Sequence, residues 1–566
     1  MQSTERLMLD FSNIDLNDKK TYHLLGMGLT KGIFQLEEHL GERYTQIIRP
    51  QCIEDVADIT AIIRPGCKES FHVDGETTML DAYCKIRNKQ MEEAYLHDDL
   101  RPILGPTHSV LIYQEQIIEI CKVIAGLSMK DADLVRYAMG KKRIDLMEKW
   151  KPAFVNGCVK QGYEKELGEK LWDWCEKASG YLFNKSHAIA YATIAFKTAY
   201  AKCHYPTQFY AAMLKFAEKK TDTYEEMLAL VNDAKLFGIR VIPPVIKEAN
   251  AEFKILDKHT ISYGVRYLKG VGTSGIEAIS RTKGASTWIE FLTLADRFRV
   301  DKTACEALIK SGVLDEFNKP RTMMMAEYEL FRALTKNEQA IVLSLVSGNL
   351  HPSILIDIDK ADFDIKRTVT KYTKWATTGI FDICGRYGPI ADLELDPPKD
   401  DFEYDFEHAI YALIECKIAN SRRAEKLTAL MAEYHDKTFG INKGLHQAWE
   451  KFYFGIPLTV YDKGLVVSAD TIPCIEVINL PADANVKIAG IIENVGYTKI
   501  KRGDSKGKTM AFIDIADNTY LLRGAIAFSE CYEKYSENIL KGTAVSILGR
   551  KMKDGNSIIV NCVKRL

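Results

Sequence analysis

The chain has 566 residues, of which 46% are hydrophobic and 27% are charged, and its formal net charge is -1. This length predicts about three to five domains rather than one core, and the near-zero charge excludes a uniformly basic surface, so contact with a polyanion would need local clusters of Lys and Arg. The 13 cysteines form no CxxC pair, which excludes the usual closely spaced zinc sites and gives no sign of a disulfide framework.

The N-terminal part of the chain is predicted to be mainly helical. Residues 1–20 are polar and show no periodicity, and they include no apolar signal region. From about residue 22 to 215 the pattern favours helices, for example Val110–Ile124 and Ser186–His204, and proline and glycine punctuate them. No stretch approaches about 18 uninterrupted apolar residues, so we expect a cytoplasmic protein without a membrane span.

The predicted secondary structure changes twice along the rest of the chain. Another helix is expected over 222–236, followed by short strands at Phe253–Ile255 and Ile261–Val265 and by further helices to about residue 350. Residues 351–480 are hard to interpret and include an acidic loop around Asp400 and Asp401. From Val486 the apolar residues alternate with period two, which predicts a small β-barrel over the last ~80 residues.

Two clusters in the helical part have the chemistry of phosphate binding. Residues 134–143 carry four cations at a helix end broken by Gly140, namely Arg136, Lys141, Lys142 and Arg143. A second cluster opens a helix, where Asn184 or Ser186 would cap the helix and Lys185 and His187 would lie near its positive end. The alternatives are a solvated basic helix end for the first cluster and a cap without a ligand for the second.

Two later segments are also candidates for nucleic-acid contact. Lys269, Gly270 and Gly272 lie in a hydrophobic-Gly-x-Gly turn typical of a helix-hairpin-helix, whose backbone N–H groups hold a DNA phosphate; an ordinary loop is the alternative. The hairpin 499–508 carries five basic residues against one acidic residue and is flanked by Tyr497 and Phe512, which suits single-stranded DNA; a merely soluble hairpin is the alternative. Its cations are Lys499, Lys501, Arg502, Lys506 and Lys508.

The order of the motifs along the chain resembles the C-family polymerases, the alpha subunits of bacterial DNA polymerase III. The match is dense over 20–315, thin over 320–445 and recovers to the end. It is carried by residues 32–37 (GIFQLE), 61–66 (AIIRPG), 112–116 (IYQEQ), 136–142, 183–187 (FNKSH), 204–206 (HYP), 268–272, 449–451 and 455–458, with 486–492 and 508–512 resembling the OB-fold.

The resemblance implies a mainly α multidomain protein with a C-terminal β-barrel. We expect an N-terminal segment (1–20), polymerase fingers (21–215), a helix-hairpin-helix domain for duplex and clamp binding (216–320), a helical region of unassigned function (321–480) and an OB-fold (481–566). The nucleotide-binding residues implied are Arg136, Lys141, Lys142, Asn184, Lys185, Ser186 and His187. The implied DNA-binding residues are Arg64, Lys269, Gly270, Gly272 and the five hairpin cations. Tyr137 stands where the family often has a second Arg, and tyrosine lacks the guanidinium fork.

The family's catalytic carboxylates have no counterpart in this sequence. Two-metal phosphoryl transfer needs carboxylates that hold the ions, and the family places three Asp in a palm that precedes the region matched here. Asp10 lies only 24 positions before Phe34, a shorter separation than the family has between its third palm motif and the segment equivalent to Phe34. Asp400 and Asp401 fall in a late acidic loop. We therefore expect no catalytic residue in this chain and a split, phage-type arrangement, with Met1 near the palm–fingers junction.

The split interpretation implies several partners. A palm- and PHP-bearing chain would hold Mg²⁺, and the assembled enzyme would use primer–template DNA and deoxynucleoside triphosphates in a bacterial host cell. A sliding clamp is a further expected partner, although Gln339–Leu343, which loosely resembles a clamp-binding peptide, fits an amphipathic core helix better. The alternatives are a non-catalytic DNA tether derived from a decayed polymerase, or a chain of an accessory polymerase.

Overall fold

A computed structural model describes residues 10–63, 72–346, 405–415, 421–437, 439–440, 442–459, 470–500, 505–553 and 555–566. The chain forms two compact units. The first consists of Met1–Met213, Ala229–Gly238 and Asp462–Leu566, and the second of Leu214–Leu228 and Ile239–Tyr461. None of the described helices is both long enough and apolar enough to cross a membrane.

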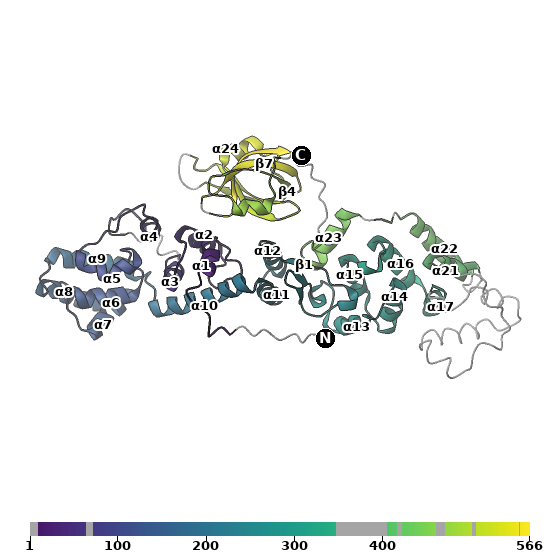
Figure 1. The fold of residues 1–566 in the computed structure, drawn as a ribbon, viewed down its shortest axis with the longest axis horizontal. Helices are drawn as coiled ribbons and strands as arrows, with labels where there is room; N and C mark the ends of the chain where they lie inside the picture. Colours follow the sequence, from purple (N-terminus) through teal and green to yellow (C-terminus); the bar gives the residue numbers. More distant parts are fainter. Residues whose placement is uncertain are drawn as a thin grey trace. The chain divides into compact units, whose positions relative to one another are not determined.

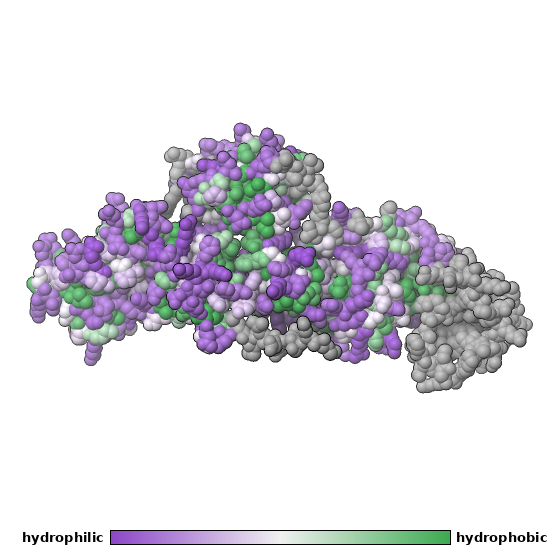
Figure 2. Space-filling view, in the orientation of Figure 1, coloured by the Kyte–Doolittle hydropathy of each residue, from purple (hydrophilic) through white to green (hydrophobic). Residues whose placement is uncertain are grey.

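The helical part of the first unit packs around α10 (Lys185–His204), which lies beside α1 and α3 (Figure 1). The buried face of α10 includes four alanines and Phe196, and the small alanine side chains let α3 approach closely. Hydrophilic residues cover much of the visible face of these helices (Figure 2). The other helices are α1 (Lys19–Gly26), α2 (His39–Ile48), α3 (Ile53–Ile62), α4 (Met79–Arg87), α5 (Arg101–Leu104), α6 (Gln114–Val123), α7 (Met129–Gly140), α8 (Ile144–Lys160) and α9 (Lys165–Ser179). Helices α11 (Pro206–Phe216) and α12 (Thr223–Lys235) each contribute residues to both units.

The C-terminal part of the first unit is the predicted barrel. Its five strands close in the order β4-β5-β6-β8-β7, antiparallel except for the β6–β8 pair. Alternate residues such as Val486, Ile488, Ile513 and Ile547 fill the interior, as the period-two pattern predicted. The strands are β4 (Asn485–Lys499), β5 (Thr509–Ala516), β6 (Leu521–Ala527), β7 (Ala544–Lys551) and β8 (Ile558–Arg565), with α24 (Ser529–Tyr535) between β6 and β7. The fold-class prediction is confirmed, and the barrel is consistent with an OB-fold.

The second unit combines a small sheet with helices. Strands β1 (Arg240–Ile242), β3 (Thr260–Ser262) and β2 (Lys254–Asp257) form the sheet in that order. Helices α13 (Thr273–Ser280), α14 (Trp288–Arg297), α15 (Lys302–Ser311), α16 (Arg321–Ala333), α17 (Lys336–Val346), α21 (Phe406–Glu415), α22 (Ser421–His435) and α23 (Lys443–Phe454) follow. In α17 Gln339, Ile341 and Val342 are buried, which agrees with the core interpretation of this segment.

Two predicted element boundaries were wrong. The helix expected from Val110 begins only at Gln114, because the Gln116 side chain accepts hydrogen bonds from the N–H groups of Ile112 and Tyr113 and holds these residues extended. The strand expected over Ile261–Val265 ends at Ser262, and Val265 instead begins a 3-10 turn. In both places apolar residues lie on the far side of the boundary from the element, Val110–Tyr113 before α6 and Val265 after β3, so hydrophobicity alone did not locate the boundary.

A buried carboxylate holds the second unit together. Glu450 in α23 is fully buried, and its Oε1 accepts a hydrogen bond from Arg321 Nη1 at 3.0 Å. Its Oε2 accepts from the backbone N–H groups of Leu458 and Thr459 at 2.9 and 2.8 Å. The 449–458 motif therefore fixes the chain leaving α23 against α16.

Candidate nucleotide- and DNA-binding sites

The segment before α6 pairs with the segment before α10. Tyr113 and Phe183 form a parallel bridge, in which Phe183 N–H donates to the Ile112 carbonyl at 2.9 Å and Gln114 N–H donates to the Phe183 carbonyl at 2.8 Å. The Gln114 side chain also donates to the Leu182 carbonyl. Two of the predicted motifs, far apart in sequence, therefore meet at one junction.

Glu115, the first acidic residue of α6, caps the amino-terminal end of α10. Its Oε1 lies 3.0 Å from both Asn184 Nδ2 and the backbone nitrogen of Lys185, and its Oε2 lies 3.0 Å from the same nitrogen. Of the two caps considered, Asn184 is the one used, because its Oδ1 accepts from His187 N–H at 2.9 Å. The anion site expected at this helix end is thus taken by a carboxylate of the protein itself, which the sequence reasoning missed although Glu115 lies in the 112–116 motif.

The basic cluster of α7 reaches the same junction. Arg136 Nη1 donates to Gln114 Oε1 at 3.1 Å, while its Nε pairs with Asp133 at 2.8 Å. Lys142 passes beside Gly180, since a Cβ on that glycine would lie 3.9 Å from Lys142 Cε. Arg136 and Lys142 thereby lie beside the 180–187 segment, on which Lys185, Ser186 and His187 are exposed; Lys141, at the end of α7, is also exposed.

A buried carboxylate lies beneath Lys185. The Lys185 Nζ is 5.8 Å from the centroid of the Tyr113 ring, and the Tyr113 hydroxyl donates to Asp58 Oδ1 at 2.5 Å. Tyr83 donates to the other oxygen of Asp58 at 2.8 Å. Burial raises the pKa of Asp58 to about 6, and the two tyrosine hydroxyls oppose that shift. Asp58 thus fixes the aromatic ring beneath the lysine.

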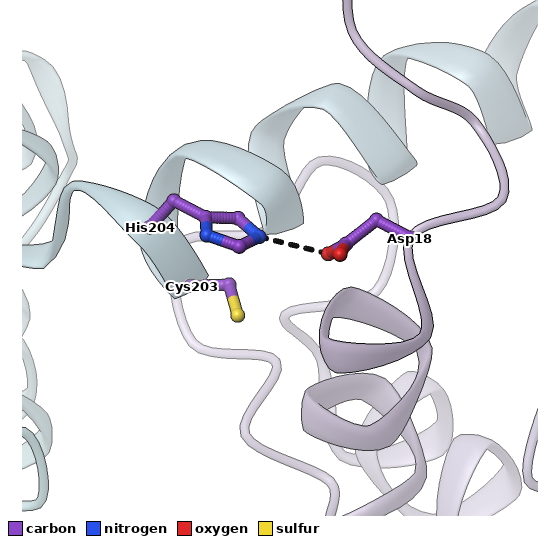
Figure 3. Close-up of side chains that lie close together, drawn as sticks. All are labelled: Asp18, Cys203 and His204. Carbon is purple, nitrogen blue, oxygen red and sulfur yellow. Dashed lines mark hydrogen bonds and ion pairs between the residues drawn. The ribbon is translucent and has the colours of Figure 1, made fainter.

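Among the described residues, one group of three side chains has the composition of a metal site: Asp18, Cys203 and His204 (Figure 3). Asp18 Oδ2 accepts from His204 Nε2 at 2.8 Å and also from the N–H and hydroxyl of Thr21, as the cap of α1. One carboxylate beside a thiol and an imidazole does not suit Mg²⁺, which prefers several oxygen ligands. The group serves instead to tie the start of α1 to the end of α10.

The hydrophobic-Gly-x-Gly turn has the geometry that its glycines predict. Gly270 has φ +93°, and a Cβ there would lie 2.8 Å from the Thr303 side chain; Gly272 caps α13. The Lys269 N–H does not face solvent, because it donates to the Tyr453 carbonyl at 3.0 Å. Lys269 Nζ lies over the Phe452 ring, 4.1 Å from the centroid, at the surface of this unit.

The basic hairpin of the barrel joins β4 and β5. Lys499, Lys506 and Lys508 are exposed, whereas Lys501 and Arg502, like Arg64 in the helical part, lie outside the described residues. The register pairs Gly496 with Phe512 and Tyr497 with Ala511, so the two aromatic residues face opposite sides of the sheet. Tyr497 contacts Tyr532 of α24. Tyr497 and Phe512 therefore do not share one face beside this loop.

The chain resembles known proteins over these same regions. Residues 1–162 match the bacterial DNA polymerase III alpha subunit finger domain, and residues 238–324 match the helix-hairpin-helix motif. The chain is 34% identical over 323 residues to DNA polymerase III subunit alpha of Aquifex aeolicus, which covers 56% of this chain and 27% of that protein.

Two further relatives of the same name show how far the likeness extends. The Borreliella burgdorferi protein is 29% identical over 563 residues, covering 97% of this chain and 41% of the relative. The Escherichia coli K12 protein is 34% identical over 321 residues, covering 56% of this chain and 27% of the relative. The chain thus spans well under half the length of these curated relatives. It carries finger and helix-hairpin-helix domains like theirs.

Proposed function

We propose that this chain supplies the nucleotide-binding fingers and the DNA-binding domains of a template-directed DNA polymerase. The observation that carries this proposal is the convergence of Arg136, Lys142 and Lys185 beside the junction of α6 and α10. Arg136, Lys142 and α6 lie within residues 1–162, which match the polymerase finger domain. The match of residues 238–324 to a DNA-binding motif supports the role in DNA replication.

In the proposed reaction the chain binds and orients substrates. Arg136 and Lys185 neutralise phosphate oxygens of the incoming deoxynucleoside triphosphate through charge-assisted hydrogen bonds, with Lys141 and Lys142 at the edge of the same site. Asn184, Ser186 and His187 offer polar groups beside them. The turn at Gly270 and Gly272 holds the duplex backbone, and the barrel hairpin guides single-stranded DNA.

The catalytic carboxylates and Mg²⁺ would come from a second polypeptide that bears the palm and the PHP domain. Magnesium supplies charge stabilisation of the transferring phosphoryl group when bound there. The proposal is that of a split, phage-type polymerase acting in the cytoplasm of a bacterial host, with a large obligate interface to the palm-bearing chain and a sliding clamp as a further partner.

The test is primer extension with Mg²⁺, using the purified chain alone and then mixed with the palm-bearing chain encoded beside it. We expect no DNA synthesis by the isolated chain and DNA synthesis after the two chains are mixed. Synthesis by the isolated chain would overturn the two-chain arrangement. DNA binding with no synthesis in either case would favour the alternative, a non-catalytic DNA tether.

A further inference from the structure

The turn of residues 32–37 presents two side chains to solvent at a conformational cost. Ile33 and Leu36 are fully buried and anchor the turn, whereas Phe34 is 36% exposed and Gln35 is also exposed. Gly32 has φ +74°, and Gln35 has φ +63°, a left-handed conformation that is unfavourable for a residue with a Cβ. Such strained residues concentrate at binding sites, so the exposed pair at the tip of this turn is a candidate for contact with a ligand.

Phe34 continues a row of aromatic rings along α10, which we name the aromatic ladder: Phe183, His187, Tyr191 and Phe34. The ring centroids of Phe183 and His187 are 5.4 Å apart, those of His187 and Tyr191 are 4.0 Å apart, and those of Tyr191 and Phe34 are 5.2 Å apart. His187 and Tyr191 lie four residues apart on one face of α10, and Phe183 lies in the segment that precedes this helix. His187 and Phe34 are exposed, and Tyr191 is half-buried.

The surroundings of the ladder favour a nucleic acid over an apolar protein surface. Its rings include the imidazole of His187 and the phenol of Tyr191, both with polar groups, and the Gln35 amide adjoins Phe34. Lys185 lies at the same end of α10 as His187, and Arg136 contacts the neighbouring Gln114. Aromatic faces with nearby cations are the arrangement by which proteins bind unpaired nucleobases without reading their sequence.

We infer that the aromatic ladder stacks on unpaired bases of single-stranded template DNA, with Phe34, His187 and Tyr191 as the stacking residues and the Gln35 amide at the base edge. This inference rests on the proposed function, because it assigns the template strand to the same face of the fingers. It also gives a role to the two exposed residues of the motif at 32–37, Phe34 and Gln35.

Photocross-linking tests the contact directly. A primer–template with 5-iodouracil at the first unpaired template position is bound to the full chain, irradiated and digested with trypsin. Adducts are expected on two peptides, residues 32–43, which contain Phe34, and residues 186–197, which contain His187 and Tyr191. Adducts found only on peptides of the barrel or of the second unit would overturn the inference.

Affinity measurements with matched variants give the second readout. Tyr191→Ala is expected to weaken binding of a primer–template with a single-stranded overhang about fivefold to tenfold, since one lost stacking contact costs about this much. Tyr191→Phe, which keeps the ring, should stay within about twofold of the parent chain. Tyr163→Ala is the control, because Tyr163 is also half-buried and also packs on a histidine, His97, at a centroid distance of 5.0 Å.

The remaining outcomes separate this inference from the proposed function. Normal DNA binding by Tyr191→Ala combined with weaker assembly with the palm-bearing chain would make the ladder a protein interface and overturn the inference alone. Equal losses on overhang and blunt duplex would do the same, because a stacking surface for unpaired bases must discriminate between them. Failure of the parent chain to bind any primer–template would overturn both.

Discussion

Glu115 Oε1 lies 3.0 Å from the backbone nitrogen of Lys185, so a carboxylate from α6 satisfies the first N–H of α10. A helix end without such an acceptor leaves N–H groups unpaired and frays more readily. The same carboxylate accepts from the Asn184 side chain. Glu115 is therefore the residue that holds the predicted nucleotide-binding segment in place.

Replacing Glu115 by Ala should loosen this segment without unfolding the chain. In the assembled polymerase we expect the KM for deoxynucleotides to rise about tenfold, corresponding to roughly 1.4 kcal/mol, with kcat changed less than about twofold. Steady-state primer extension measures both constants, and Glu119→Ala on the same helix is the control. A fall in KM would contradict a positioning role and would mean that the carboxylate competes with the triphosphate.

Lys185→Ala and Arg136→Ala should each reduce nucleotide use while duplex binding stays nearly unchanged. The loss of one charge-assisted phosphate contact predicts a decrease in kcat/KM of about 10- to 100-fold. Extension kinetics and anisotropy with blunt duplex are compared for each variant. Lys160→Ala, at the end of α8, serves as a surface control. An equal loss of nucleotide use and duplex affinity would argue against a nucleotide site at this junction.

Glu450→Ala should strongly destabilise the second unit. It removes the acceptor of three hydrogen bonds and leaves the buried Arg321 guanidinium without one of its carboxylates, a loss worth about 3–5 kcal/mol. Limited proteolysis and thermal unfolding should both show earlier opening of this unit. Lys451→Ala, the exposed neighbour, should leave the melting temperature unchanged, and similar melting curves for the two variants would refute the structural role of Glu450.

The barrel hairpin predicts a salt-dependent contact with single-stranded DNA. Combined replacement of Lys499, Lys506 and Lys508 by Ala should lower the affinity for single-stranded DNA. If each lysine neutralises one phosphate, the slope of log affinity against log salt concentration should decrease in magnitude by about 2. Filter binding of a homopolymer at several salt concentrations gives the slope. An unchanged slope would contradict the DNA contact and favour the alternative, a solvent-exposed hairpin without a ligand.

The buried Asp58 predicts a pH dependence of stability. Its pKa of about 6 in the folded chain exceeds the ordinary value, so the folded state binds more protons than the unfolded state between about pH 4 and pH 6. Its contribution to the free energy of unfolding therefore falls as pH rises through this range and is constant above it. Thermal unfolding is measured for both chains at several pH values. As pH rises to about 6, the melting temperature of the Asp58→Asn variant should increase relative to that of the parent chain. Parallel profiles for the two chains would contradict the raised pKa.

Much of the architecture followed from local sequence patterns. The period-two alternation from Val486 identified the barrel, and the caps and punctuation identified the helices, because side-chain burial repeats with the geometry of each element. The motif at 268–272 was predicted to form a glycine turn, and the φ of +93° at Gly270 agrees with it. The start of α6 was missed because the apolar residues Val110–Tyr113 precede the helix and were counted as part of it.

The sites depended on contacts between distant segments. The sequence placed Arg136 and Lys185 in separate motifs, and only the pairing of Tyr113 with Phe183 brings both residues to Gln114 and Glu115. Conversely, Tyr497 and Phe512 flank one loop in sequence but face opposite sides of the sheet, because strand register decides the face. Residue type and order thus determined which chemistry the chain carries, and tertiary packing decided which side chains share a site, since that packing is set by long-range burial and pairing that no local pattern records.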